Sequence, residues 1–102
     1  MPNLFRVDDI YVANNDNLDS LAMPNLFRVD DISVENNAKL ASLTMNKLEN
    51  VMGFIERGRI IVYNNANLDS LAMPNLDYVR GRIFVDPKPA SCNMGDLSSN
   101  CS

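Results

Sequence analysis

The chain has 102 residues and a formal net charge of −4, and it contains no histidine. A nucleic acid is a poor partner for such a chain, because phosphate binding requires a clustered basic surface. The lack of histidine excludes a Ser-His-Asp triad. No run of 18 or more apolar residues is present, so the sequence contains no segment expected to span a membrane as a helix.

Two stretches of the chain occur twice. Residues 1–10 have the same sequence as residues 23–32, and residues 17–26 have the same sequence as residues 67–76. The copies begin at Leu4, Leu26, Leu48 and Leu76, so the first two steps are equal and the third is longer. The chain is therefore a repeat protein with two regular steps and one step that carries six extra residues.

Aligning the copies places apolar residues in six columns. The columns are Val7, Val29, Val51 and Val79; Ile10, Ile32, Ile60 and Ile83; Val12, Val34, Val62 and Val85; Leu18, Leu40 and Leu68; Leu21, Leu43 and Leu71; and Met23, Met45 and Met73. The Ile-x-Val and Leu-x-x-Leu-x-Met alternations are interrupted by Asn-Asn or Pro-Asn, which is typical of short strands joined by turns. A stable helix needs roughly ten or more uninterrupted residues, so strands are favoured.

A single copy cannot bury its own apolar side, whereas copies stacked about 4.8 Å apart bring equal residues together in ladders. The sequence therefore predicts an all-β solenoid, a right-handed β-helix of about four coils with a period near 22 residues. We expect one solenoid domain over residues 1–86 and an irregular C-terminal tail over residues 87–102. Because the chain starts in mid-repeat, we expect a fragment of a longer array, with flanking repeats or self-association at the open solenoid ends.

Two columns of asparagine follow the Ile-x-Val strands. They are Asn14, Asn36 and Asn64, and beside them Asn15, Asn37 and Asn65. Asparagine tolerates left-handed backbone, and its amide can bond the backbone of the next copy. We interpret both columns as structural ladders that close a corner, with a polar recognition stripe as the alternative.

Aspartates align in the first two copies, where Asp8 matches Asp30 and Asp9 matches Asp31. Like charges in register repel each other, and a calcium ion would relieve that repulsion with oxygen ligands. The neighbouring Arg6 and Arg28 can neutralise the pairs instead, and the third copy has no aspartate there. A solvated charged face is thus the preferred interpretation, and we expect neither a metal nor a cofactor.

The six extra residues lie between Val51 and Ile60. Either Gly53-Phe54-Ile55 completes a strand before a bulge, or residues 57–60 pair with residues 80–83, which also read Arg-Gly-Arg-Ile. The second alignment gathers four basic residues, Arg57, Arg59, Arg80 and Arg82. This basic patch is a candidate site for an anion or an acidic glycan, and a tolerated bulge with surface arginines is the alternative.

The tail contains both cysteines of the chain, Cys92 and Cys101. Two cysteines without histidine or further cysteines cannot form a structural zinc site alone. In a secreted chain they would pair and close a loop of about ten residues, which would stabilise the fold by roughly 2–3 kcal/mol. We predict a disulfide-closed cap or linker, with disorder as the alternative.

Two family patterns resemble these copies. The series Val7-x-x-Ile10-x-Val12-x-x-Asn15-x-x-Leu18 is similar to a leucine-rich repeat with one residue added before the last leucine. Residues 79–85 and 60–68 look more like the receptor L-domain repeat, although the first two copies have Asp-Asp where that family favours glycine. The resemblance covers roughly residues 1–86 and implies a right-handed β-helix, as in receptor ectodomains and fungal cell-wall proteins.

The resemblance and the lack of any catalytic set together favour a non-catalytic module at the cell surface or outside the cell. We expect it to recognise a protein or glycan ligand or to act as a scaffold. A purely structural spacer in a cell wall or matrix is the alternative, and an ice-binding solenoid is a remote one, since Thr44 is the only threonine. The aligned Ser20, Ser42 and Ser70 are interpreted as small packing residues.

Overall fold

The structure, a computed structural model, describes residues 6–53 and 58–101 and consists of short strands with a single 3₁₀ helix in that part of the chain. The strands are β1 (Arg6–Ala13), β2 (Ser20–Ala22), β3 (Arg28–Glu35), β4 (Ser42–Thr44), β5 (Asn50–Val51), β6 (Ile60–Tyr63), β7 (Ser70–Ala72), β8 (Tyr78–Val79), β9 (Ile83–Asp86) and β10 (Ser91–Asn93), and the 3₁₀ helix is η1 (Gly95–Cys101). The prediction of an all-β chain is therefore confirmed.

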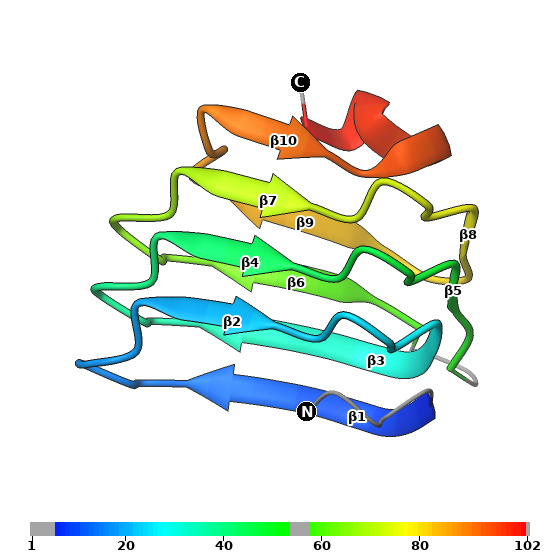
Figure 1. Ribbon diagram of the computed structural model, residues 1–102, viewed down its shortest axis with the longest axis horizontal. Helices are drawn as coiled ribbons and strands as arrows, with labels where there is room; N and C mark the ends of the chain where they lie inside the picture. The colour runs from blue at the N-terminus through cyan, green and yellow to red at the C-terminus, as the bar shows by residue number, and fades with distance from the viewer. Residues whose placement is uncertain (1–5, 54–57, 102) are drawn as a thin grey trace.

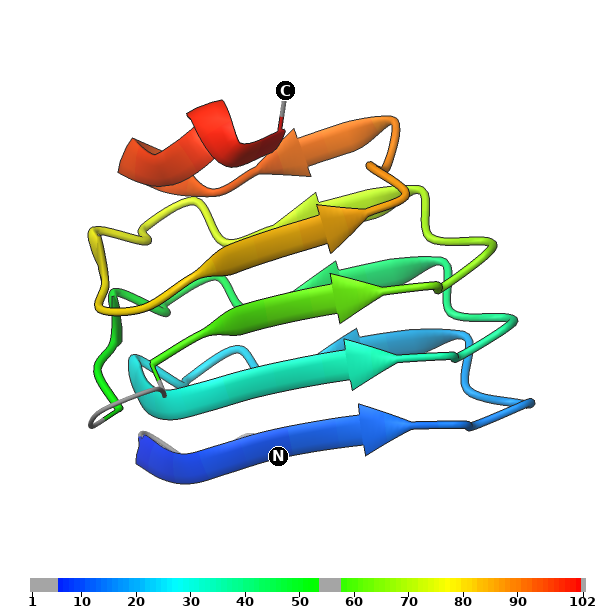
Figure 2. The same ribbon diagram turned by 180° about the vertical axis from the view of Figure 1, so that it is seen from behind.

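The strands form two parallel sheets that face each other. The larger sheet has the order β8-β5-β3-β6-β9, with β1 paired to β3, and the smaller sheet has the order β10-β7-β4-β2. Figures 1 and 2 show that the chain passes from one sheet to the other and back as it climbs from β1 to β10. The strand pairs of both sheets are parallel, as expected when copies of one unit lie on top of each other.

The register of the strands is the one that the columns predict. In the larger sheet three columns pair in order from one copy to the next. They are Val7, Val29, Val51 and Val79; Ile10, Ile32, Ile60 and Ile83; and Val12, Val34, Val62 and Val85. In the smaller sheet Leu21 pairs with Leu43 and Leu43 with Leu71. The prediction that equal residues meet in ladders is thus confirmed.

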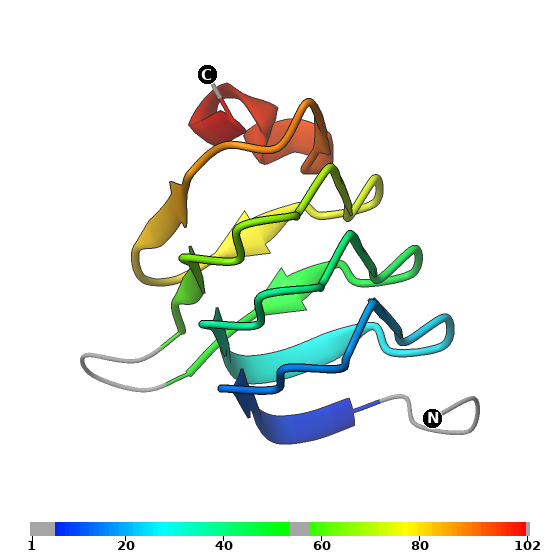
Figure 3. The ribbon, with the colours of Figure 1, turned by 90° about the vertical axis from the view of Figure 1, so that its left-hand side faces the viewer.

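Figure 3 shows the stacked copies from the side, and one apolar core is formed by buried side chains from both sheets. Its central members come from the predicted columns, since Val34, Leu40, Leu43 and Met45 each expose 0% of their surface. Removing a core leucine such as Leu43 would leave a cavity and cost about 2–5 kcal/mol. Burial therefore fixes the register, because a slip of one residue would turn these side chains out to solvent.

The strand register before and after the six extra residues shows where in the repeat they are inserted. Val51 pairs with Val29 at the regular step, whereas Ile60 pairs with Ile32 across the longer one. Across the insertion, the N–H of Gly81 donates to the carbonyl of Gly58 at 2.8 Å. Residues 58–60 therefore align with residues 81–83, as the second alignment predicts, and Arg57 lies outside the described residues.

The prediction of an irregular C-terminal tail is wrong. Residues 91–93 form β10, which continues the smaller sheet by pairing Ser91 with Ser70 and Cys92 with Leu71. The next residue, Met94, is completely buried, and Leu97 of η1 packs against the core. The tail therefore adds a layer to the sheet and covers the end of the core, because Ser-Cys-Asn-Met fills the places of Ser-Leu-Ala-Met in the copy below.

Candidate functional site

The Asn-Asn corner is the most regular polar feature of the structure. The first asparagine of each pair is in left-handed backbone, with φ of 59° at Asn14, 58° at Asn36 and 57° at Asn64. Left-handed backbone costs most residues about 1–2 kcal/mol, and asparagine visits it more readily because its short side chain bonds locally. The first column therefore turns the chain, as its residue type predicts.

The second column, Asn15, Asn37 and Asn65, forms a hydrogen-bonded chain that we call the Asn ladder. Asn15 donates its N–H and Nδ2 to Asn37 Oδ1 at 3.1 and 3.0 Å, and Asn37 donates in the same way to Asn65 Oδ1 at 3.1 and 3.0 Å. Asn37 and Asn65 are 0% and 2% exposed. Asn37 and Asn65 are buried amides with hydrogen-bond partners, so the structural interpretation is confirmed at these two positions, whereas Asn15 is exposed.

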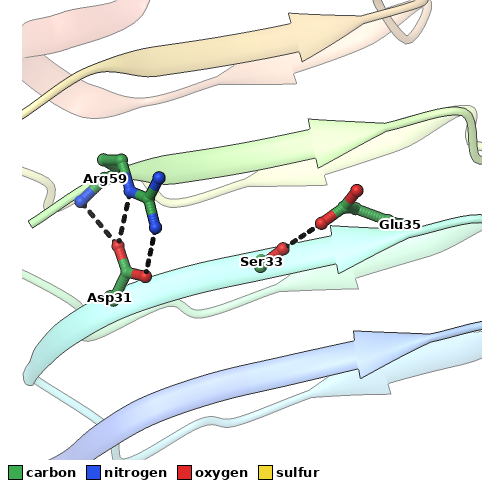
Figure 4. A network of polar contacts seen from close by, with 4 residues as sticks. All are labelled: Asp31, Ser33, Glu35 and Arg59. Atoms are coloured by element: carbon green, nitrogen blue, oxygen red, sulfur yellow. Dashed lines mark hydrogen bonds and ion pairs between the residues drawn. The ribbon is translucent and has the colours of Figure 1, made fainter. Parts of the chain in front are cut away.

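Asp31 is bound by an arginine from the copy above it. Its Oδ1 accepts the backbone N–H of Arg59 at 2.9 Å and Nε at 3.4 Å, and its Oδ2 accepts a terminal nitrogen of Arg59 at 3.2 Å (Figure 4). The Asp31 side chain is 13% exposed. This contact neutralises Asp31 with Arg59, whereas the sequence suggested Arg28, whose Nε is buried with no hydrogen-bond partner among the described residues.

The predicted basic patch is only partly described. Arg57 lies outside the described residues, Arg59 binds Asp31, and Arg80 and Arg82 are exposed. Gly58, with φ of +75°, packs so closely that an added Cβ would lie 3.0 Å from Arg80 Cβ. Gly58 thus lies close to Arg80, while the binding of an anion there stays a prediction.

The remaining predictions concern the disulfide, a metal site and a membrane-spanning helix. Cys92 is disulfide-bonded, and the side chain of its predicted partner Cys101 lies outside the described ones. Within the described ranges, no three His, Cys, Asp or Glu side chains are grouped to hold a metal ion. Over residues 6–53 and 58–101, no helix has the length and apolar character to cross a lipid bilayer.

Aromatic side chains gather on the outward side of the larger sheet, which we call the outer face. It comprises the outward residues of β1, β3, β6 and β9, which pair as Tyr11, Ser33, Ile61 and Phe84 and as Ala13, Glu35, Tyr63 and Asp86. Tyr11 is 71% exposed, Tyr63 42% and Phe84 39%. The rings of Tyr63 and Phe84 lie 5.8 Å apart at a tilt of 35°, within the range of favourable aromatic pairs.

Polar groups border these rings. The hydroxyl of Ser33 donates to Glu35 on the same strand (Figure 4), and the pair of Asp31 and Arg59 lies at the start of β6. The outer face thus has an apolar group, Ile61, Tyr63 and Phe84, with the polar residues of β3 beside it, and aromatic residues next to polar ones are usual at protein-binding surfaces. Sequence reasoning missed the outer face, although the residues between Ile and Val in each Ile-x-Val strand could have revealed it.

Comparison with protein-family models, with curated proteins and with solved structures finds no match to this chain. The functional interpretation therefore depends on its own residues and on their arrangement.

Proposed function

We propose that this chain is a non-catalytic repeat module that recognises a protein ligand through the outer face, in the manner of a receptor L domain at the cell surface. The proposed architecture is a right-handed β-helix of about four coils, with residues 1–86 as the repeat domain and residues 87–102 as its cap. The observation that carries the proposal is the exposure of Tyr11, Tyr63 and Phe84 on one sheet.

A sheet suits recognition because the backbone beneath it moves little when a partner binds. Tyr63 and Phe84 lie on neighbouring strands held by the pairs of Ile60 with Ile83 and Val62 with Val85. Rigid aromatic side chains lose little conformational entropy in a contact, and tyrosine and other aromatic residues are enriched at the centres of interfaces. The outer face thus combines a fixed scaffold with residues that supply binding free energy.

A scan for protein ligands tests this proposal. Purified extracellular proteins are passed over the immobilised chain, and each protein that binds is measured again with the double variant Tyr63→Ser, Phe84→Ser. We expect at least a tenfold loss of affinity for the double variant and no change for the control Tyr78→Ser, which removes an aromatic ring of similar exposure from β8, a strand of the larger sheet that is not part of the outer face. Ligands that bind the double variant and the original chain equally would contradict the proposal.

The structural spacer is the second candidate function, and the regular step from Val29 to Val51 favours it. Deleting one regular copy from the protein separates the two functions. A spacer keeps its role with a shorter reach, whereas a recognition surface that spans several copies loses binding. An ice-binding role would require rows of small or threonine side chains, and the outer face has tyrosine, isoleucine and phenylalanine in those places.

A further inference from the structure

A pocket opens at the corner that follows the strands of the smaller sheet, away from the outer face. We call it the corner pocket. Its volume is about 350 Å³, and it is lined by Asn25, Phe27, Lys47, Glu49 and Asn75. These residues come from the links between β2 and β3, between β4 and β5, and between β7 and β8. Three successive copies therefore contribute to one site.

The backbone under the corner pocket is fixed by the repeat. In each copy a turn is closed by a bond from the N–H of Leu26, Leu48 or Leu76 to the carbonyl of Met23, Met45 or Met73, at 3.4, 3.2 and 3.1 Å. All three leucines are buried. The backbone of the residue before each of them, Asn25, Lys47 or Asn75, therefore occupies the same position in its turn. The pocket is thus preorganised, which lowers the free-energy cost of binding.

Contacts between copies set the backbone spacing of the lining residues and orient one of their side chains. The N–H of Glu49 donates to the carbonyl of Phe27 at 2.9 Å, which sets these two residues side by side. The Nδ2 of Asn75 donates to the carbonyl of Asn46 at 2.5 Å, so the orientation of this amide is fixed. The corner pocket therefore combines one oriented amide, that of Asn75, with the exposed side chains of Lys47 and Glu49.

The chemistry of the lining residues selects the kind of ligand. Phe27 is 44% exposed, in a column that holds Phe5 in the first copy and Glu49 and Asp77 in the later ones, so it offers an apolar surface next to the charge of Glu49. Lys47 and Glu49 carry opposite charges that cancel, which disfavours a strongly anionic or cationic ligand. Amide groups both donate and accept hydrogen bonds, as the hydroxyls of a sugar do.

We propose that the corner pocket binds a neutral saccharide, with one face of a sugar ring on Phe27 and its hydroxyls on Asn25, Lys47, Glu49 and Asn75. A purely apolar ligand would cover the polar side chains of Asn25, Lys47 and Glu49 without offering them hydrogen-bond partners, which costs free energy. The proposal is independent of the outer face, because the two sites share no residue. A volume of about 350 Å³ is at the small end of ligand sites, so we expect a dissociation constant on the order of 1 mM for a short oligosaccharide.

A titration followed by nuclear magnetic resonance tests this proposal on the full chain. The probes are cellohexaose, laminarihexaose and chitohexaose as neutral saccharides, and hexagalacturonic acid as the acidic comparison. We expect at least one neutral probe to shift the amide signals of Asn25, Phe27 and Glu49 in a saturable way. If no neutral probe shifts them at about 10 mM, roughly ten times the expected dissociation constant, or if only the acidic probe does, the proposal is overturned.

Variants with matched controls locate the binding. Phe27→Ala should weaken binding of the neutral saccharide at least tenfold, whereas Phe27→Tyr, which keeps the ring, and Tyr78→Ala, which removes an exposed ring outside the pocket, should bind within about twofold of the original chain. Because Phe27 is exposed, its replacement leaves the core intact, and unchanged signals elsewhere verify the fold. Equal binding by Phe27→Ala and the original chain would contradict the proposal, whatever the outcome for the outer face.

Discussion

The two kinds of corner in this molecule use the same residue type in opposite ways. After β3 and β6, the second asparagine of each pair is buried: Asn37 and Asn65 are 0% and 2% exposed and bond to the copies around them. After β2 and β7, Asn25 and Asn75 line an open pocket. Burial, and not residue type, decides which asparagine holds the fold and which is available to a ligand, and substitutions at the two corners should therefore have very different effects.

The largest effect is expected for Asn37→Ala. This change removes two donors and two acceptor contacts of a buried amide, including the bond from Nδ2 to the carbonyl of Val12 at 3.1 Å. Each buried polar group that loses its partner costs about 1–3 kcal/mol, so we expect a loss of roughly 3 kcal/mol or more in the free energy of unfolding. Urea denaturation followed by circular dichroism measures this loss.

The matched control for that variant is Asn25→Ala at the other corner, which should change the free energy of unfolding by less than about 0.5 kcal/mol. Equal losses at Asn25 and Asn37 would show that the distinction between the two corners is wrong.

A smaller effect is expected for Asn36→Val. Asn36 has φ of 58°, and a β-branched residue in left-handed backbone should cost about 1–2 kcal/mol. Asn36→Gly removes the same side-chain contact with Asn64 but has no Cβ, so it should cost less than Asn36→Val. Thermal unfolding of both variants gives the comparison, and a glycine variant no more stable than the valine variant would refute a backbone origin.

Asn75→Ala should have a modest effect. Asn75 is exposed, and the bond that its side chain makes goes to the carbonyl of Asn46. An exposed hydrogen bond contributes about 0.5–1 kcal/mol, so the expected loss of stability lies in that range. A loss as large as that of Asn37→Ala, measured under the same denaturation conditions, would mean that the corner pocket has a structural role.

The smallest effect is expected for Lys47→Asn, which places a third asparagine between Asn25 and Asn75. If asparagine in register were sufficient to form a ladder, this change would stabilise the protein. Because Lys47 is exposed and water competes for its hydrogen bonds, we expect a change of less than about 0.5 kcal/mol in either direction. Differential scanning calorimetry distinguishes these outcomes, and a gain above about 1 kcal/mol, the value of a typical net hydrogen bond, would show that register matters more than burial.

Much of the fold could be predicted because the copies are nearly identical. Val29 and Val51, or Leu43 and Leu71, occupy the same position in a repeated unit, and only stacking in register buries them all. The strand β10 was missed because Cys92 replaces the leucine of its column and was interpreted through its disulfide chemistry. The signal was present in Ser91 and Met94, which match Ser70 and Met73.

The candidate sites were harder to predict from the sequence. The contact between Asp31 and Arg59 depends on the longer step between copies, and the competing alignments left that step undecided. Phe27 stands in a variable column, so nothing in the pattern distinguished it before the structure placed it beside Lys47 and Glu49. Both proposed sites lie at positions where the copies differ, and repetition predicts these positions least well.

The presence of identical segments in register also affects how the number of copies in such a chain can change during evolution. Residues 1–10 and 23–32 are the same, so the corresponding stretches of the gene can misalign during copying and gain or lose one regular unit. Because each strand pairs with its equivalent in the next copy, such an event would alter the height of the molecule by one strand spacing of about 4.8 Å without disturbing its cross-section.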